Sequence, residues 1–192
     1  MNRPTAKINQ MENRLRLIRR TLGKDFHWFR KNYFQRGNRL EDAAFHKEIA
    51  EILFKMQKNR GTKFAIAAPR GSGKSTIITL EYVIYCICYK LEEFIVLVSA
   101  TSTLAEAHLS NIKQELLGNP RLLHDFPDIC EISMPPKPSR WANKEVITKN
   151  GIKILALGAE QSPRGLRNRV HRPTLHTLED IDSPFLIMDE MG

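Results

Sequence analysis

The sequence lacks a hydrophobic run long enough to span a membrane, and it contains few cysteines. Its longest apolar stretch, residues 82–89, lies between Glu81 and Lys90, whereas a membrane-spanning helix needs about 20 apolar residues. The first residues lack the apolar core of a secretory signal. The three cysteines, at positions 86, 88 and 130, have neither metal-site spacing nor a disulfide pattern. We therefore expect a cytoplasmic protein without a membrane partner.

Basic residues outnumber acidic ones only in the amino-terminal third of the chain. Residues 1–62 hold 15 Lys and Arg against 6 Asp and Glu, and residues 63–192 hold 15 of each. The whole net charge of +9 therefore lies in the first segment. This charge fits a polyanion such as nucleic acid, and it equally fits a solvated helix face.

The basic segment, residues 1–62, has the hydrophobic periodicity of helices. Apolar residues recur at helical spacing in residues 10–24 and 41–58, with an aromatic stripe at Phe26, Phe29 and Tyr33 between them. Aromatic side chains among basic ones can stack on nucleic-acid bases, but such a stripe more often packs in a core. We expect this helical segment to pack on the edge of a second unit, residues 63–192.

Residues 63–76, KFAIAAPRGSGKST, have the layout of a phosphate-binding loop. A short apolar strand, residues 64–68, leads into two glycines and then into a long apolar helix pattern. Glycines let backbone N–H groups approach phosphate oxygens, and a helix start adds unpaired N–H groups and the positive end of the dipole. The motif is G-x-x-x-x-G-K-[ST] with an alanine in the first position. The expected nucleotide contacts are Ala68, Pro69, Arg70, Gly71, Ser72, Gly73, Lys74, Ser75 and Thr76.

Two side chains in this motif have specific chemical tasks. Lys74 would place a charge on the β and γ phosphates of ATP, and Ser75 would give an oxygen ligand to Mg²⁺. Both follow the glycines directly, which is the order that the chemistry needs. The sequence therefore predicts a nucleotide site with ATP and Mg²⁺.

The rest of the chain predicts an α/β fold. The strand at residues 64–68 is followed by an apolar helix at 75–91, a β-branched strand at 92–100 and a helix at 103–117, and this order contains a βαβ unit. Residues 119–142 contain five prolines and are expected to be irregular. Asn150-Gly151 predicts a hairpin. We expect a P-loop NTPase of the additional-strand type, with a mostly parallel sheet flanked by helices and an N-terminal helical segment.

An NTPase also needs acidic residues beside the loop, at the end of a neighbouring strand. One candidate pair is Glu179 and Asp180, which follow LHTL. The other is Asp189 and Glu190, which follow the more hydrophobic FLIM but stand near the end of the chain. Arginine-rich residues 158–173 offer Arg164, between a proline and a glycine, as a phosphate contact.

Four segments together resemble the N-terminal ATPase domain of tailed-phage terminase large subunits. They are FHKEIAEIL, APRGSGKST, FIVLVSATSTLAEAHLSNIKQEL and GAEQSPRGLRNRVHRPTLHTLEDID, and the likeness runs from about Phe45 to Asp182. The resemblance implies that Glu179 helps to bind Mg²⁺ and that Asp180 is catalytic, in preference to the later pair. It also implies that Arg70 senses the γ-phosphate.

The resemblance adds further expectations about site, partners and activity. Arg164 would reach a neighbouring subunit, and Phe45 and His46 would contact adenine. The family pumps double-stranded DNA into a procapsid in the host cytoplasm during phage assembly, as an oligomer that works with a small terminase subunit and a portal. Its nuclease domain is separate, so no nuclease activity is expected here. The alternatives are another P-loop nucleic-acid translocase or helicase-type ATPase, and an inactive prophage remnant that binds nucleotide or DNA without turnover.

Overall fold

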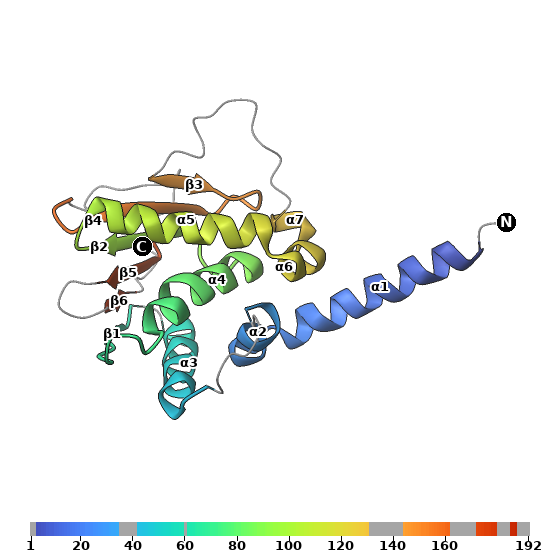
Figure 1. The fold of residues 1–192 in the computed structure, drawn as a ribbon, viewed down its shortest axis with the longest axis horizontal. Helices are drawn as coiled ribbons and strands as arrows, with labels where there is room; N and C mark the ends of the chain where they lie inside the picture. The colour runs from blue at the N-terminus through green and yellow to red at the C-terminus, as the bar shows by residue number, and fades with distance from the viewer. Residues whose placement is uncertain are drawn as a thin grey trace.

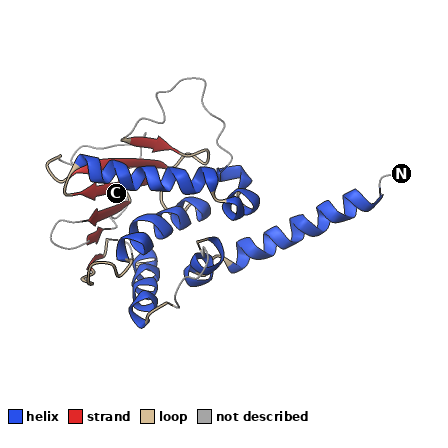
Figure 2. Cartoon of the chain, in the orientation of Figure 1, coloured by secondary structure: helices blue, strands red, loops and turns tan. Residues whose placement is uncertain are grey.

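A computed structural model of the protein describes residues 3–34, 42–59, 61–130, 144–161, 172–179 and 185–187. It has an α/β architecture, in which a sheet is flanked by helices and one long helix extends away from the body (Figures 1 and 2). The helices are α1 (Arg3–Leu22), α2 (Phe26–Tyr33), α3 (Ala44–Lys58), the π-helix η1 (Thr76–Tyr82), α4 (Val83–Tyr89), α5 (Ser102–Gly118), α6 (Pro120–Asp125) and α7 (Pro127–Cys130). The strands are β1 (Lys63–Ala65), β2 (Phe94–Ser99), β3 (Glu145–Ile147), β4 (Lys153–Gly158), β5 (Leu175–Glu179) and β6 (Phe185–Ile187).

The described strands form one six-stranded sheet in the order β1-β6-β5-β2-β4-β3. Strand β2 is parallel to β4 and β5, while β6 is antiparallel to both β1 and β5 and β3 is antiparallel to β4. It follows that β1, β5, β2 and β4 run in one direction and that β6 and β3 run in the other. The described sheet is therefore mostly parallel in strand direction, with one reversed strand between β1 and β5.

The central strand β2 explains the continuous hydrophobic run in the sequence, because all six of its residues are buried. Ile95 and Leu97 belong to the cluster that includes the helices, whereas Phe94, Val96 and Val98 form a second cluster. Successive strand residues point to opposite faces, so both faces of β2 are covered. This is the burial expected of a parallel strand at the centre of a sheet.

The hairpin predicted around Asn150-Gly151 is confirmed. Strands β3 and β4 pair antiparallel, with Val146 opposite Ile154. Gly151 has a φ of 89°, which a glycine adopts without steric cost. The Asn150 side chain donates to the carbonyl of Ile87 at 2.8 Å, so the turn is also fixed to helix α4.

The helix expected at residues 75–91 is present but is not uniform. Helical structure begins at Lys74, takes the π form through η1 and returns to the α form in α4. It ends at Lys90, which adopts the left-handed conformation with a φ of 50°. Single π-helical turns inside α-helices often occur near functional sites, and this one directly follows the predicted phosphate loop.

The prediction that residues 119–142 are irregular was wrong for the part that the structure describes. Residues 120–130 form the short helices α6 and α7. The Asn119 side chain accepts from the backbone N–H groups of Arg121 and Leu122, and Pro120 stands in the first turn of α6. An Asn-Pro pair is a helix start signal, so the sequence did contain the information. Residues 131–143 lie outside the described part of the chain.

Two helices of the basic segment, α2 and α3, belong to the core. Phe29 and Leu53 have no exposed surface, and both lie in the same hydrophobic cluster as residues of η1, α4 and α5. Phe26 and Tyr33, the other members of the predicted aromatic stripe, are also buried. The interpretation of this stripe as core packing is therefore confirmed.

Helix α1 projects from the body (Figure 1), and charged contacts hold its carboxyl-terminal end. Arg19 binds the buried carboxylate of Asp125 at 2.7 Å, and Arg20 binds Asp128 at 3.1 Å. Two of the basic side chains behind the polyanion hypothesis are thus already paired with carboxylates. Among the described helices, none combines the length and hydrophobicity that crossing a membrane requires.

We expect Asp125→Asn to destabilise the protein by about 2 kcal/mol at pH 7, because the carboxylate accepts charged hydrogen bonds. Burial by itself raises the pKa of Asp125, but hydrogen bonds from Arg19, His124 and Tyr33 outweigh it and lower the pKa. A lowered pKa stabilises the fold above the ordinary carboxyl range and ceases to do so as the pH falls through the folded-state value. Urea unfolding of wild type and variant at pH 7 and pH 3 should show the difference shrinking in acid.

The control for this variant is Asp128→Asn, which removes an exposed partner of Arg20. Exposed ion pairs contribute about 0–1 kcal/mol, so this change should be nearly neutral. Equal losses for the two variants, or a loss at Asp125 that does not depend on pH, would contradict the assignment.

Candidate functional site

Residues 66–73, here named the glycine loop, connect β1 to the helix that begins at Lys74. Gly71 and Gly73 both have a φ of 78°, a left-handed conformation that favours glycine. The amide of Ile77 donates to the carbonyl of Gly73 at 3.0 Å, which places the start of helical bonding at that glycine. The predicted sequence of strand, loop and helix is therefore confirmed, with a strand shorter than expected.

The side chain of Lys74 folds back across the glycine loop. Its ammonium group donates to the carbonyl of Ala68 at 2.9 Å. Ala68 replaces the first glycine of the motif, and it is not among the described residues with positive φ. Lys74 thus joins the two ends of the loop and places a positive charge beside the backbone of the helix start.

The outer side of the glycine loop is open to solvent. Pro69, Arg70 and Gly71 are exposed, whereas Ser72 and Ser75 are half-buried. The Ser75 hydroxyl makes no capping hydrogen bond to the helix that it begins. The loop crest can therefore be reached by a ligand, and the guanidinium of Arg70 extends from it.

Strand register bears on the choice between the two acidic pairs. Ala65 and Leu178 both pair with Phe185 of β6, so β1 and β5 end at the same edge of the sheet. The glycine loop follows Ala65 at this edge, and Glu179 is the last residue of β5. The two strands are two spacings apart, about 10 Å. Glu179 thus stands at the sheet edge where ligands of α/β proteins bind.

Strand β6 ends at the other edge. Its last residue, Ile187, pairs with Lys63 and His176, which are near the beginnings of β1 and β5. Although β6 stands near the end of the chain, it pairs with strands on both sides. Its reversed direction places its carboxyl end away from the glycine loop, and this argues against the second acidic pair.

Several predicted site residues lie outside the described part of the chain. They are Arg164, Asp180, Asp189 and Glu190. Glu179 is described through its backbone alone. In β5 itself the Thr177 side chain is buried and His176 is half-buried, so polar residues do occur within this internal strand.

Helix α3 brings one of the two predicted adenine contacts to the glycine loop. The Nε2 atom of His46 lies 2.8 Å from the carbonyl oxygen of Ser72, and the ring of Phe45 is 4.1 Å from that of His46 between centroids. The contact between His46 and Ser72 connects residues that are 26 positions apart. The structure thus brings His46 to the loop backbone, a contact that spacing alone does not indicate.

Sequence reasoning missed a buried pair of charges next to this site. Arg30 of α2 and Glu81 of η1 are 2% and 1% exposed, and they form a hydrogen-bonded ion pair. Each interrupts an apolar helical stripe, which was the available signal. A charge on a buried face needs a partner, so two such charges in one chain predict a pair.

No group of three or more His, Cys, Asp or Glu side chains that could hold a metal ion occurs in the described residues. Mg²⁺ that is bound with a nucleotide usually keeps several waters and takes only one or two protein ligands besides phosphate oxygens. Ser75 and Glu179 are the predicted protein groups. Both belong to the sheet edge at which the glycine loop lies.

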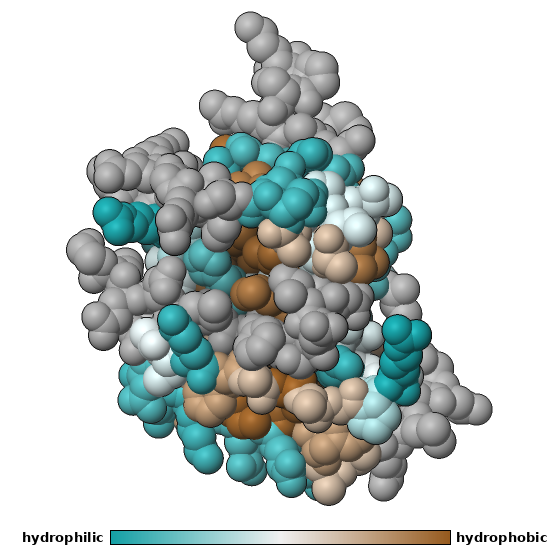
Figure 3. Space-filling model, turned by 90° about the vertical axis from the view of Figure 1, so that its left-hand side faces the viewer, coloured by the Kyte–Doolittle hydropathy of each residue, from teal (hydrophilic) through white to brown (hydrophobic). Residues whose placement is uncertain are grey.

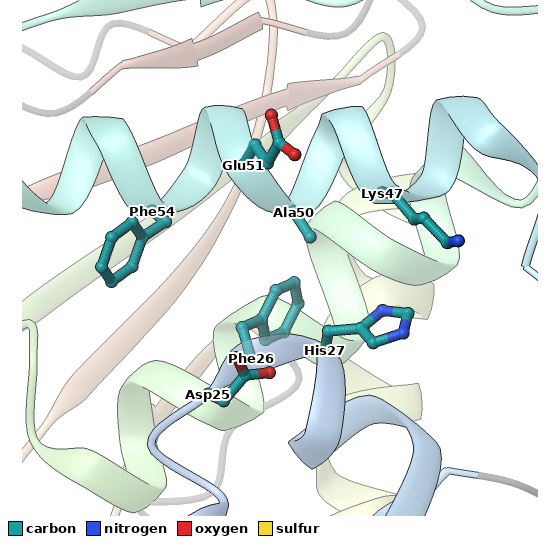
Figure 4. Close-up of a pocket in the computed structure, with 7 residues that line it drawn as sticks. All are labelled: Asp25, Phe26, His27, Lys47, Ala50, Glu51 and Phe54. Atoms are coloured by element: carbon teal, nitrogen blue, oxygen red, sulfur yellow. The ribbon is translucent and has the colours of Figure 1, made fainter.

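A separate cavity of about 470 Å³ lies between the start of α2 and helix α3 (Figure 4). Phe26 of α2 lies opposite Ala50 of α3, and Phe54 closes one end. Acidic and basic side chains both line the rim. Because none of its lining residues comes from the glycine loop, this cavity is not the predicted nucleotide site.

The side of the molecule that faces left in Figure 1 is shown in Figure 3. Hydrophobic and hydrophilic groups both appear on this face. Comparisons with protein-family models, curated proteins and solved structures found no match to this chain. Any proposal about its function therefore depends on its residues and their geometry.

Proposed function

We propose that this chain is an ATP-hydrolysing motor domain similar to that of phage terminase large subunits, and that it acts on double-stranded DNA. The observation that supports this most is the glycine loop. Two glycines with positive φ lead directly into a helix whose first residue, Lys74, folds its ammonium over the loop backbone. This arrangement suits a polyphosphate better than any other ligand class.

The proposed site assigns separate tasks to separate groups. The backbone N–H groups at the helix start hold phosphate oxygens, and Lys74 leaves the Ala68 carbonyl to neutralise the β and γ phosphates. Ser75 and Glu179 would hold Mg²⁺, which neutralises charge on the phosphates when it is bound. Asp180 would orient or deprotonate the attacking water. Positioning and electrostatics, rather than covalent chemistry, then account for the rate.

The arginines of the site are assigned by resemblance. Arg70 on the exposed crest would sense the γ-phosphate, and Arg164 would reach a neighbouring subunit. The small terminase subunit and the portal remain proposed partners, and the site of action would be the host cytoplasm during phage assembly. From the same resemblance we propose that the working form is an oligomer.

The DNA substrate can be tested by the polymer that stimulates hydrolysis. Mg²⁺-dependent ATP hydrolysis by the purified chain is measured alone, with duplex DNA and with single-stranded DNA. Stronger stimulation by the duplex supports a packaging motor. Stronger stimulation by single strands would favour a helicase-type ATPase, and ATP binding without hydrolysis would favour the inactive remnant.

A second experiment decides between the acidic pairs. We expect Asp180→Asn to reduce ATP hydrolysis by at least about 100-fold, a loss typical of a proton-transfer group, and Glu190→Gln to leave it within about twofold. The reason is the reversed direction of β6, whose carboxyl end lies away from the glycine loop. Steady-state hydrolysis by wild type and both variants measures this. The opposite ranking would refute the assignment and leave the ATPase itself intact.

A further inference from the structure

We propose that His46 is a positioning residue that fixes the peptide between Ser72 and Gly73, at the end of a polar chain through Asp42 and Arg30 to Glu81, here named the brace. This inference rests on the proposed function, since the loop that it fixes is the one assigned to ATP. It assigns His46 to the loop backbone, a different task from contact with adenine.

The first step is the tautomer of His46. Its Nδ1 atom lies 3.2 Å from the backbone nitrogen of Ala43, which can only donate. Nδ1 therefore accepts that hydrogen bond, and the proton of the neutral ring lies on Nε2. Nε2 is 2.8 Å from the Ser72 carbonyl, which can only accept. Both contacts agree on one tautomer with a proton on Nε2.

The second step concerns the peptide that His46 holds. In a planar trans peptide, the C=O and the following N–H point in opposite directions. His46 draws the Ser72 carbonyl towards α3, so the N–H of Gly73 points away from α3. The positive φ at Gly73 continues the turn, and successive N–H groups in such turns make concave anion sites. Holding the carbonyl thus orients a donor that phosphate needs.

The third step connects the loop to the protein interior. Asp42 directly precedes Ala43, whose N–H donates to Nδ1 of His46, and the Asp42 carboxylate accepts from both terminal nitrogens of Arg30 at 3.5 Å. The carboxylate is also 3.5 Å from Nδ1, but in this tautomer both atoms are acceptors, so the link to His46 is the backbone N–H of Ala43. The Nε of Arg30 donates to Glu81. Glu81 belongs to η1, the same helix that leaves the glycine loop. The brace therefore closes a ring that holds both the loop and its helix against α2 and α3.

The measurement compares the dissociation constants of MgATP, MgGTP and magnesium pyrophosphate for wild type, His46→Ala, His46→Gln and Glu48→Ala. His46→Ala loses one oriented donor, so its dissociation constants for all three ligands should rise by a similar factor, about five- to tenfold. His46→Gln keeps an N–H donor and should restore part of the affinity. Glu48→Ala, an exposed change on the same helix, should have no effect.

The outcomes separate the brace from its rivals. A loss for ATP alone, with pyrophosphate unchanged, would overturn the proposal in favour of an adenine contact. If wild type binds and hydrolyses ATP but His46→Ala binds all three ligands as tightly as wild type, the proposal is also overturned. If wild type binds no nucleotide, the proposed function fails by itself.

The tautomer provides a test that needs no nucleotide. Long-range proton–nitrogen NMR spectra of the full chain report which ring nitrogen of His46 carries the proton. A single neutral form protonated at Nε2 supports the brace. A form protonated at Nδ1, or rapid averaging between the two, would overturn it whatever the fate of the ATPase.

Discussion

Lys74→Ala is expected to reduce ATP hydrolysis by at least about 100-fold, because the variant loses a preorganised charge on the transferred phosphoryl group. Wild-type Lys74 donates to the Ala68 carbonyl at 2.9 Å, and this single contact is easily exchanged for phosphate oxygens. The effect should appear in the steady-state rate with saturating MgATP. Nucleotide affinity should fall as well, since the same charge acts on the bound ground state.

The matched control is Lys63→Ala, which removes the same charge from an exposed residue of the strand that precedes the loop. Its hydrolysis rate should stay within about twofold of wild type. Circular dichroism of both variants tests that the fold is retained. Equal rates for Lys74→Ala and wild type would rule out the glycine loop as the ATPase site, while equal losses in both variants would indicate a general charge effect.

The glycine loop could be predicted because its chemistry is local. Gly71, Gly73 and Lys74 follow one another in the chain, and their conformations depend on neighbours within a few residues. The hairpin at Asn150-Gly151 has the same property. In such places residue type and turn geometry agree at one point of the sequence.

The sheet order could not be obtained in this way. Strand β6 lies between β1 and β5 and runs against both, although nothing in FLIM distinguishes a reversed strand from a parallel one. The hydrophobicity of that stretch favoured Asp189 and Glu190 as the acidic pair. Strand direction depends on pairing over long range, and only the pairing shows that β5 shares the direction of β1 while β6 opposes it.

The brace as a whole could not be predicted from the sequence, since its members come from distant segments. Arg30 and Glu81 are 51 positions apart, and His46 reaches a carbonyl 26 positions away. Arg30 and Glu81 each interrupt an apolar stripe, but the sequence does not indicate which charge either of them meets. Only the packing of α2 and α3 against η1 makes them neighbours, and that packing depends on the shared hydrophobic core.

Arg30→Met is expected to destabilise the protein by about 3–5 kcal/mol, because it removes the guanidinium that pairs with the buried carboxylate of Glu81. Glu81 is 1% exposed, so water cannot replace the lost guanidinium. A whole domain is stabilised by about 5–15 kcal/mol, and this single change therefore removes a large part of the total. Urea unfolding followed by circular dichroism gives the free energy of unfolding for each variant.

The double variant Arg30→Met, Glu81→Met separates the burial of a charge from the loss of packing. When both charges are replaced by apolar groups of similar volume, stability should return to within about 1–2 kcal/mol of wild type, since a buried pair contributes little beyond the cost of its own desolvation. A double variant as unstable as Arg30→Met would show that shape, not charge, matters at this position.

If the brace also orients the glycine loop, the stable double variant should still bind magnesium pyrophosphate less tightly than wild type, because Asp42 and His46 have lost their connection to η1. Full affinity in that variant would confine Arg30 and Glu81 to a role in folding and leave loop positioning to His46 and Asp42.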